Sequence, residues 1–242
     1  MNNTDLSKIF NLISKSLGEN DLHFKRVRIT LTENGTLNDN SFANITFDDF
    51  YGYRIKRISN KAFGKSDKTI KQFWCASCEL SETPLEYNVW TTLSQLTEVK
   101  WLDLRLNVTQ IPSNAFKTNN EAESKIKSLT LYLTPRQRLT IQSNAFNNLK
   151  QLLEIEFLSE VDFFKIEKST FNFSRVNNSR IAMLFMASIL TGDIFAPGSF
   201  DGNKQQLEID FPSSNISYIP ESSFKYVLNN AENLIDFSSI DP

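Results

Sequence analysis

The sequence predicts a solenoid of the α/β class, in which short parallel strands stack as successive turns of one repeating unit. A short phrase that ends in phenylalanine recurs along the chain, as "IPSNAF" at 111–116 and "IQSNAF" at 141–146. Stretches of alternating apolar and polar residues recur in phase with this phrase, and alternation with period two is the pattern of a strand. Self-similarity at a fixed spacing is typical of repeat architectures.

The phrase has six recognisable copies. They end at Phe63, Phe116, Phe146, Phe171, Phe200 and Phe224, and the steps between them are 53, 30, 25, 29 and 24 residues. The first step is about twice the others. We therefore expect one unmarked repeat between the first and second copies.

The alternating stretches predict eight strands. Their inward apolar residues end at Phe47, Phe73, Leu104, Leu131, Phe157, Phe185, Phe211 and Phe237, with steps of 26, 31, 27, 26, 28, 26 and 26 residues. This regular spacing leaves no room for hairpins and predicts a parallel ladder. Burying the apolar side chains of one turn stabilises it by about 10 kcal/mol. Ordering the residues of that turn costs roughly 1 kcal/mol each, which is more in total, so the turns are stable only when stacked.

The first 24 residues predict an N-terminal cap helix and lead-in, followed by the solenoid over 25–242. The predicted helix has one apolar face, formed by Leu6, Ile9, Phe10, Ile13 and Leu17. Such a face would cover the first turn. An anchor at a membrane surface is the alternative, for which the segment has few positive charges.

The stretch "VKWLDLRLN" followed by "IPSNAF" resembles the leucine-rich repeat. With one residue missing after the asparagine, its consensus positions are filled by Val99, Leu102, Leu104, Asn107, Ile111, Pro112, Ala115 and Phe116. This resemblance implies a horseshoe, with the parallel sheet on the concave face and an irregular or short helical convex side. It also implies a C-terminal cysteine-rich cap, before which the chain is expected to be truncated.

Several segments together resemble secreted arthropod leucine-rich-repeat proteins grouped with the non-catalytic subunit of Oplophorus luciferase (Oplophorus-luciferin 2-monooxygenase). These segments are "FWCASCEL", "LNVTQIPSNAF", "LTIQSNAF", "LTGDIFAPGSF" and "IPESSFKYVL". The resemblance covers roughly residues 25–242. It implies an accessory subunit that stabilises a partner and performs no chemistry.

Composition and hydropathy argue against nucleic acid as a partner, against a membrane span and against a signal peptide. The net charge of −2 and the pI near 5.6 argue against nucleic acid, which requires clustered Lys and Arg. No run approaches the roughly 20 apolar residues of a membrane span. The opening residues lack the pattern of a signal peptide.

Few residues in the sequence could support catalysis. "FWCASC" resembles the Cys-x-x-Cys of thiol–disulfide oxidoreductases, but a structural disulfide between Cys75 and Cys78 is the favoured interpretation, with free thiols as the other alternative. His23 is the only histidine, so a catalytic triad or a zinc site of the usual type lacks members. We expect no enzyme activity, no cofactor and no metal.

The residues that alternate with the buried ones predict a partner-binding surface on the concave face. We assign to it Trp101, Asp103, Arg105, Ser128, Thr130, Tyr132, Glu154, Glu156, Glu208 and Asp210. Residues 150–242 hold 13 Asp and Glu against 7 Lys and Arg, whereas residues 1–149 hold 15 against 19. An acidic strip that attracts a basic protein is one interpretation, and a solvated face that keeps the chain soluble is the other.

Glycosylation acceptors of the form N-x-[ST] favour an extracellular, secreted protein. We assign them to Asn34, Asn44, Asn107, Asn172, Asn177 and Asn215. The predicted function is a non-enzymatic scaffold for protein–protein interaction, with a protein partner expected to be basic. The alternatives are the ectodomain fragment of a leucine-rich-repeat receptor or adhesion protein and, less favoured, a Cys-x-x-Cys oxidoreductase.

Overall fold

The computed structural model forms a parallel β-solenoid of about seven turns with few helices. It describes residues 3–18, 22–119, 123–133, 139–159, 163–173, 180–186, 189–190, 194–212, 215–216, 218, 221–229 and 232–236. The chain divides into two compact units. Unit 1 comprises Met1–Leu106 and Thr118–Ala122, and unit 2 comprises Asn107–Lys117 and Glu123–Pro242.

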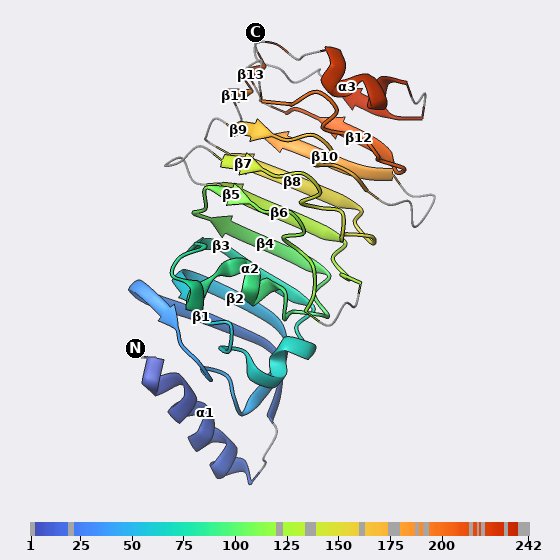
Figure 1. Cartoon of the computed structure of the whole chain (residues 1–242). Coiled ribbons are helices and arrows are strands. Elements are labelled where there is room, and N and C mark those ends of the chain that lie inside the picture. The colour runs from blue at the N-terminus through green and yellow to red at the C-terminus, as the bar shows by residue number, and fades with distance from the viewer. Residues whose placement is uncertain are drawn as a thin grey trace. The chain divides into compact units, whose positions relative to one another are not determined.

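Unit 1 contains four parallel strands (Figure 1). After helix α1 (Asn3–Leu17) come β1 (Leu22–Leu37), β2 (Ile45–Ile58), β3 (Gln72–Leu80) and β4 (Trp101–Leu106). Each strand pairs in parallel with the next along the chain. The connections carry short helices, which are η1 (Gly64–Lys68), η2 (Leu85–Tyr87) and α2 (Val89–Leu93).

Unit 2 contains five parallel strands of the same kind. They are β6 (Ser128–Leu133), β8 (Glu154–Ser159), β10 (Arg180–Met186), β12 (Gln206–Asp210) and β14 (Leu234–Asp236), paired in this order. Shorter strands form a second ladder beside them (Figure 1), made of β5 (Gln110–Ile111), β7 (Leu139–Ile141) and β9 (Phe163–Ile166). The remaining elements are β11 (Ile189–Leu190), its partner β13 (Asn215–Ile216) and helix α3 (Glu221–Leu228).

All eight predicted strands have a counterpart that pairs in parallel, which confirms the solenoid; the last is described to Asp236, and Phe237 lies outside the described residues. The structure adds a ninth, β1, which begins at Leu22 inside the segment expected to be a cap helix and lead-in. Its alternation is broken because Lys25 and Arg26 lie between Phe24 and Val27, which pair with the buried residues Phe47 and Phe50 of β2. The period-two pattern therefore did not reveal it.

Stacked phenylalanine rings form the core of unit 2. The ring at the end of each phrase lies on that of the next turn, with centroids 5.8 Å apart from Phe116 to Phe146, 5.7 Å from Phe146 to Phe171 and 4.9 Å from Phe171 to Phe200. A second column runs through the strands, from Phe157 to Phe185 at 4.9 Å and on to Phe211 at 5.3 Å. Such pairs contribute about 0.5–1.5 kcal/mol beyond burial.

The fourth residue of four of the five phrases in unit 2 joins neighbouring turns. Asn114, Asn144, Ser169 and Gly198 all have positive φ, from 56° to 77°. The backbone N–H of Ser169 donates to the carbonyl of Gly198 at 2.8 Å, and the other members donate to the next turn in the same way at 3.0–3.4 Å. Asparagine and glycine tolerate this conformation better than other residues, which explains why the phrase reads "SNAF".

Unit 1 contains a copy of the phrase that the sequence pattern did not reveal, "LNDNSF" at 37–42. Its fourth residue, Asn40, has φ of 60° and donates to the carbonyl of Lys61 at 3.0 Å. Its last residue, Phe42, is fully buried and stacks on Phe63 with centroids 5.6 Å apart. Phe10 of α1 also packs against Phe42, at 5.9 Å, so the helix covers the first turn of unit 1.

Candidate functional site

The outward face of the unit 2 sheet carries the predicted carboxylates. The strand register places Ser128, Glu154, Ala182 and Glu208 in one row and Thr130, Glu156, Leu184 and Asp210 in the next. The residues between the two rows, such as Ile155 and Ile209, are fully buried. We call Glu154, Glu156, Glu208 and Asp210 the carboxylate face.

Neighbouring side chains hold two of these carboxylates in place. The hydroxyl of Ser128 donates to Glu154 Oε2 at 3.4 Å, and the hydroxyl of Thr130 donates to Glu156 Oε2 at 3.2 Å. Thr130 is only 7% exposed, so it supports Glu156 and has little surface for a partner. Tyr132 is half-buried at the end of the same strand.

The carboxylates of β12 have a different environment. Arg180 Nη1 lies 3.4 Å from Glu208 Oε2, in an ion pair whose side chains are both more than 40% exposed. Asp210 Oδ1 is buried and has no hydrogen-bond partner among the described residues. The two acidic strands are separated by the apolar side chains of Ala182 and Leu184.

The outward face of the unit 1 sheet carries the other predicted residues. Trp101 is 47% exposed, Asp103 is half-buried and Arg105 is exposed on β4. The register places Trp101 beside Gln72 and Asp103 beside Trp74. These three side chains are therefore part of a larger outward surface in unit 1.

That surface includes a group that the sequence reasoning missed, Arg26, Arg28, Tyr51, Tyr53 and Trp74, which we call the Arg–Tyr–Trp cluster. The guanidinium carbon of Arg26 lies 4.8 Å from the Tyr51 ring centroid, and that of Arg28 lies 5.8 Å from both tyrosine rings. The Trp74 ring lies 4.9 Å from Tyr53 and 6.1 Å from Tyr51. Cation–π contacts of this kind hold guanidinium groups in place while leaving their N–H donors available.

The signal for this cluster was present in "FYGYRI", where two tyrosines flank a glycine. Gly52 has no room for a side chain, because a Cβ atom there would lie 2.7 Å from Ile55 Cδ1 and 2.8 Å from Cys75 Sγ. The tyrosines on either side face outward while this glycine lies over the core. Because β1 was not predicted, nothing in the sequence pattern placed the two arginines beside them.

Cys75 and Cys78 form a disulfide within β3, and both residues are fully buried. The disulfide occupies the interior beside Gly52. Among the described residues, no group of three or more His, Cys, Asp and Glu side chains could hold a metal ion.

The predicted glycosylation acceptors occupy different environments. Asn44 is exposed in the turn before β2, and Asn107 follows β4 and is half-buried. The amide of Asn172 donates to Asn144 Oδ1 at 3.3 Å, so it already contributes to the stacking of turns. Asn34 and Asn215 lie in β1 and β13, and Asn177 lies outside the described residues.

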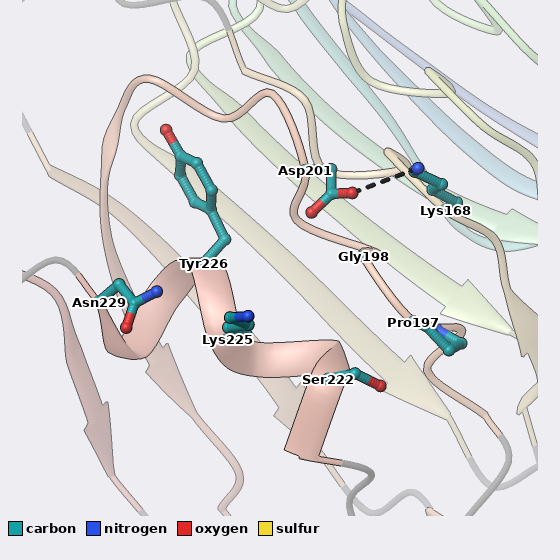
Figure 2. A pocket seen from close by; sticks show the side chains of 8 residues that line it. All are labelled: Lys168, Pro197, Gly198, Asp201, Ser222, Lys225, Tyr226 and Asn229. Atoms are coloured by element: carbon teal, nitrogen blue, oxygen red, sulfur yellow. Dashed lines mark ion pairs between the residues drawn. The ribbon is translucent and has the colours of Figure 1, made fainter.

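A shallow hollow of about 410 Å³ lies beside α3 in unit 2 (Figure 2). Lys168 Nζ and Asp201 Oδ2 form an ion pair of 3.5 Å at its edge, while Lys225 and Tyr226 reach it from the helix. The side chains of this ion pair are 69% and 44% exposed. Small-molecule sites are usually enclosed and mostly apolar, whereas this hollow is open and has Lys168, Asp201 and Lys225 in its lining.

Comparison with known proteins returns no family: no protein-family model matches the chain, and no curated protein matches it. Among the described residues, no helix is long and apolar enough to cross a membrane.

Proposed function

We propose that this protein is a non-enzymatic solenoid that binds another protein through the outward face of its sheet. The observation that carries the proposal is the Arg–Tyr–Trp cluster together with Trp101. Tyr, Trp and Arg are the residues that dominate binding energy at protein interfaces. Rings fixed against each other and against guanidinium groups lose little conformational entropy on binding, so this surface is suited to a protein partner.

We further propose that the solenoid belongs to the leucine-rich-repeat class and is an accessory subunit of a secreted complex. The support for the class is a turn of about 26 residues, with a parallel strand followed by a buried phrase phenylalanine. The disulfide of β3 supports an oxidising, extracellular compartment. A receptor or adhesion ectodomain would have the same surfaces and remains the second candidate.

The environment of the disulfide and of the histidine counts against catalysis. A redox-active cysteine needs an accessible sulfur, whereas Cys75 and Cys78 are fully buried. His23 Nδ1 lies 3.0 Å from Thr46 Oγ1, and Nε2 lies 3.6 Å from Asp48 Oδ1. The His23 side chain is 53% exposed on an open sheet, where water competes with a substrate for these groups.

Affinity capture from secretions of the source organism tests the proposal. The wild-type chain and a Trp101→Ala variant are immobilised side by side, and the captured proteins are quantified by mass spectrometry. The matched control is Tyr226→Ala, which removes a similarly exposed ring from α3. We expect one protein to be captured by the wild type and the control and to be depleted about tenfold on Trp101→Ala; equal capture by all three contradicts the proposal.

A further inference from the structure

We propose that the partner is a second copy of this chain, with the Arg–Tyr–Trp cluster of one copy docked on the carboxylate face of the other. This inference rests on the proposed function, because it names the occupant of the same outward faces. The shallow hollow beside α3 takes no part in the proposed contact between the two copies.

The charges of the two surfaces are complementary. The carboxylate face contains four acidic side chains on β8 and β12; Glu208 has a partly exposed ion pair with Arg180, and one carboxylate oxygen of Asp210 is buried. The cluster presents Arg26 and Arg28 from β1; Arg26 also lies 3.5 Å from Asp49, so the cluster keeps a net positive charge. Complementary charged surfaces attract one another and suppress wrong partners.

The spacing along the strands also matches. Arg26 and Arg28 are two residues apart on one strand and face the same way, as do Glu154 and Glu156. Residues two apart on a strand are separated by about 6.6 Å. Two guanidinium groups can therefore meet two carboxylates at once when β1 of one copy lies along β8 of the other.

The next strands continue the match, since neighbouring strands lie about 4.8 Å apart in both sheets. Beyond β8, strand β10 presents the apolar side chains of Ala182 and Leu184, and beyond β1, strand β2 presents Tyr51 and Tyr53. Tyrosine rings can cover apolar side chains while their hydroxyls remain solvated. Across β8, β10 and β12 of one copy the side chains are acidic, apolar and acidic. They face the basic, aromatic and aromatic side chains of β1, β2 and β3 of the other copy.

Both surfaces are arranged before contact. Tyr51 and Tyr53 hold the two guanidinium groups, while Ser128 and Thr130 hold the carboxylates of Glu154 and Glu156. Arg–carboxylate pairs can be bidentate, and a fixed guanidinium loses less side-chain entropy when it forms them. The contact joins two different surfaces of the chain. If each of two copies uses both of its surfaces on the other, the result is a closed two-fold dimer; if each copy binds a different neighbour at each surface, the result is an open chain of copies.

Sedimentation velocity of the full chain tests the inference. At low salt we expect the weight-average mass to rise with protein concentration above that of one chain. At about 1 M salt, where the screening length is about 3 Å, we expect the mass of a single chain. A wild-type protein that stays at the mass of one chain at low salt overturns the inference.

Charge reversal identifies the surfaces. The double variants Arg26→Glu/Arg28→Glu and Glu154→Arg/Glu156→Arg should each weaken self-association at least about tenfold. An equimolar mixture of the two should associate again, because each then complements the other. The control Lys168→Glu/Lys225→Glu makes the same charge change as the arginine reversal, but at the hollow, and should associate like the wild type.

Self-association that survives both reversals, or a mixture that does not regain it, overturns the inference. If circular dichroism shows that a reversal variant is unfolded, Arg26→Gln/Arg28→Gln and Glu154→Gln/Glu156→Gln carry the test. A wild-type monomer that still captures a different protein through Trp101 leaves the proposed function standing and removes only this inference. Capture that is indifferent to Trp101 removes the proposed function itself.

Discussion

The backbone N–H of Asn144 donates a hydrogen bond to the carbonyl oxygen of Ser169, 3.0 Å away, and both residues have positive φ, of 58° and 56°. This bond joins two consecutive turns at the same position of the repeated phrase. The side chain of Asn144 makes a second link, because its Oδ1 accepts from the amide of Asn172 at 3.3 Å. The asparagine of the phrase thus links consecutive turns through hydrogen bonds of its backbone and its side chain.

Replacing Asn144 tests how much this link between turns contributes to stability. Asn144→Ala should lower the free energy of unfolding by about 1–2 kcal/mol, because alanine is strained at positive φ and the link to Asn172 is lost. Asn144→Gly relieves the strain and should cost less than Asn144→Ala. Urea denaturation of both variants checks the order, and an equal loss would contradict the conformational explanation.

The stacked rings make Phe171 a central residue of the unit 2 core. It is fully buried and lies 5.7 Å from Phe146 and 4.9 Å from Phe200, measured between ring centroids. We expect Phe171→Ala to lower the free energy of unfolding by about 3–5 kcal/mol, through lost burial and a cavity. The control Tyr218→Ala, at a site with 62% exposure, should change the free energy of unfolding little. If thermal denaturation shows comparable losses of stability for both variants, the stacked phenylalanine rings are not the source of stability.

Gly52 separates the two tyrosines of the cluster and lies over the disulfide. We expect Gly52→Ala to destabilise the protein by about 1–3 kcal/mol, because the added methyl overpacks the space shared with Ile55 and Cys75. Ser77→Ala, on an exposed position of β3, is the control. Denaturant titration of the oxidised protein compares them, and a neutral Gly52→Ala would show that the interior has room there.

Asp67 should make stability depend on pH. Burial raises the pKa of its carboxyl from 3.8 to about 7, and the charge of Lys68 lowers it in part. The folded protein therefore binds this proton more tightly than the unfolded chain, so its contribution to stability is complete below about pH 4 and is lost as the pH rises to about 7. Asp67→Asn removes the dependence.

The free energy of unfolding of Asp67→Asn minus that of the wild type should therefore grow between about pH 4 and pH 7 and stay constant above pH 7. Urea titrations at pH 4, 5.5, 7 and 8.5 measure this difference. A difference that is flat across the range, or that falls as the pH rises, would show that the Asp67 carboxyl is ionised in the folded protein.

The sequence was sufficient to predict the strands whose inward residues alternate without interruption. It was insufficient where two outward residues come together, as Lys25 and Arg26 do in β1, because a period-two pattern does not reveal a strand whose alternation is interrupted. The phrase ending at Phe42 was missed because it begins with Leu37 where most copies begin with Ile.

The carboxylates of the candidate site could be predicted from alternation alone, since Glu154 and Glu156 face the same way on any regular strand. The Arg–Tyr–Trp cluster could not, because it depends on which strands are neighbours. Arg28 meets Tyr51 only through the β1–β2 pairing. From unit 1, the predicted partner-binding surface therefore included only residues of β4, namely Trp101, Asp103 and Arg105.

The central claim is that the outward sheet face binds a protein. Hydroxyl-radical footprinting of the chain, alone and with its captured partner bound, measures this claim most directly, because it reports the accessibility of individual aromatic side chains. We expect Tyr53, Trp74 and Trp101 to become protected while Tyr226 of α3 keeps its reactivity. Protection at Tyr226 with the three outward residues unchanged would contradict the account.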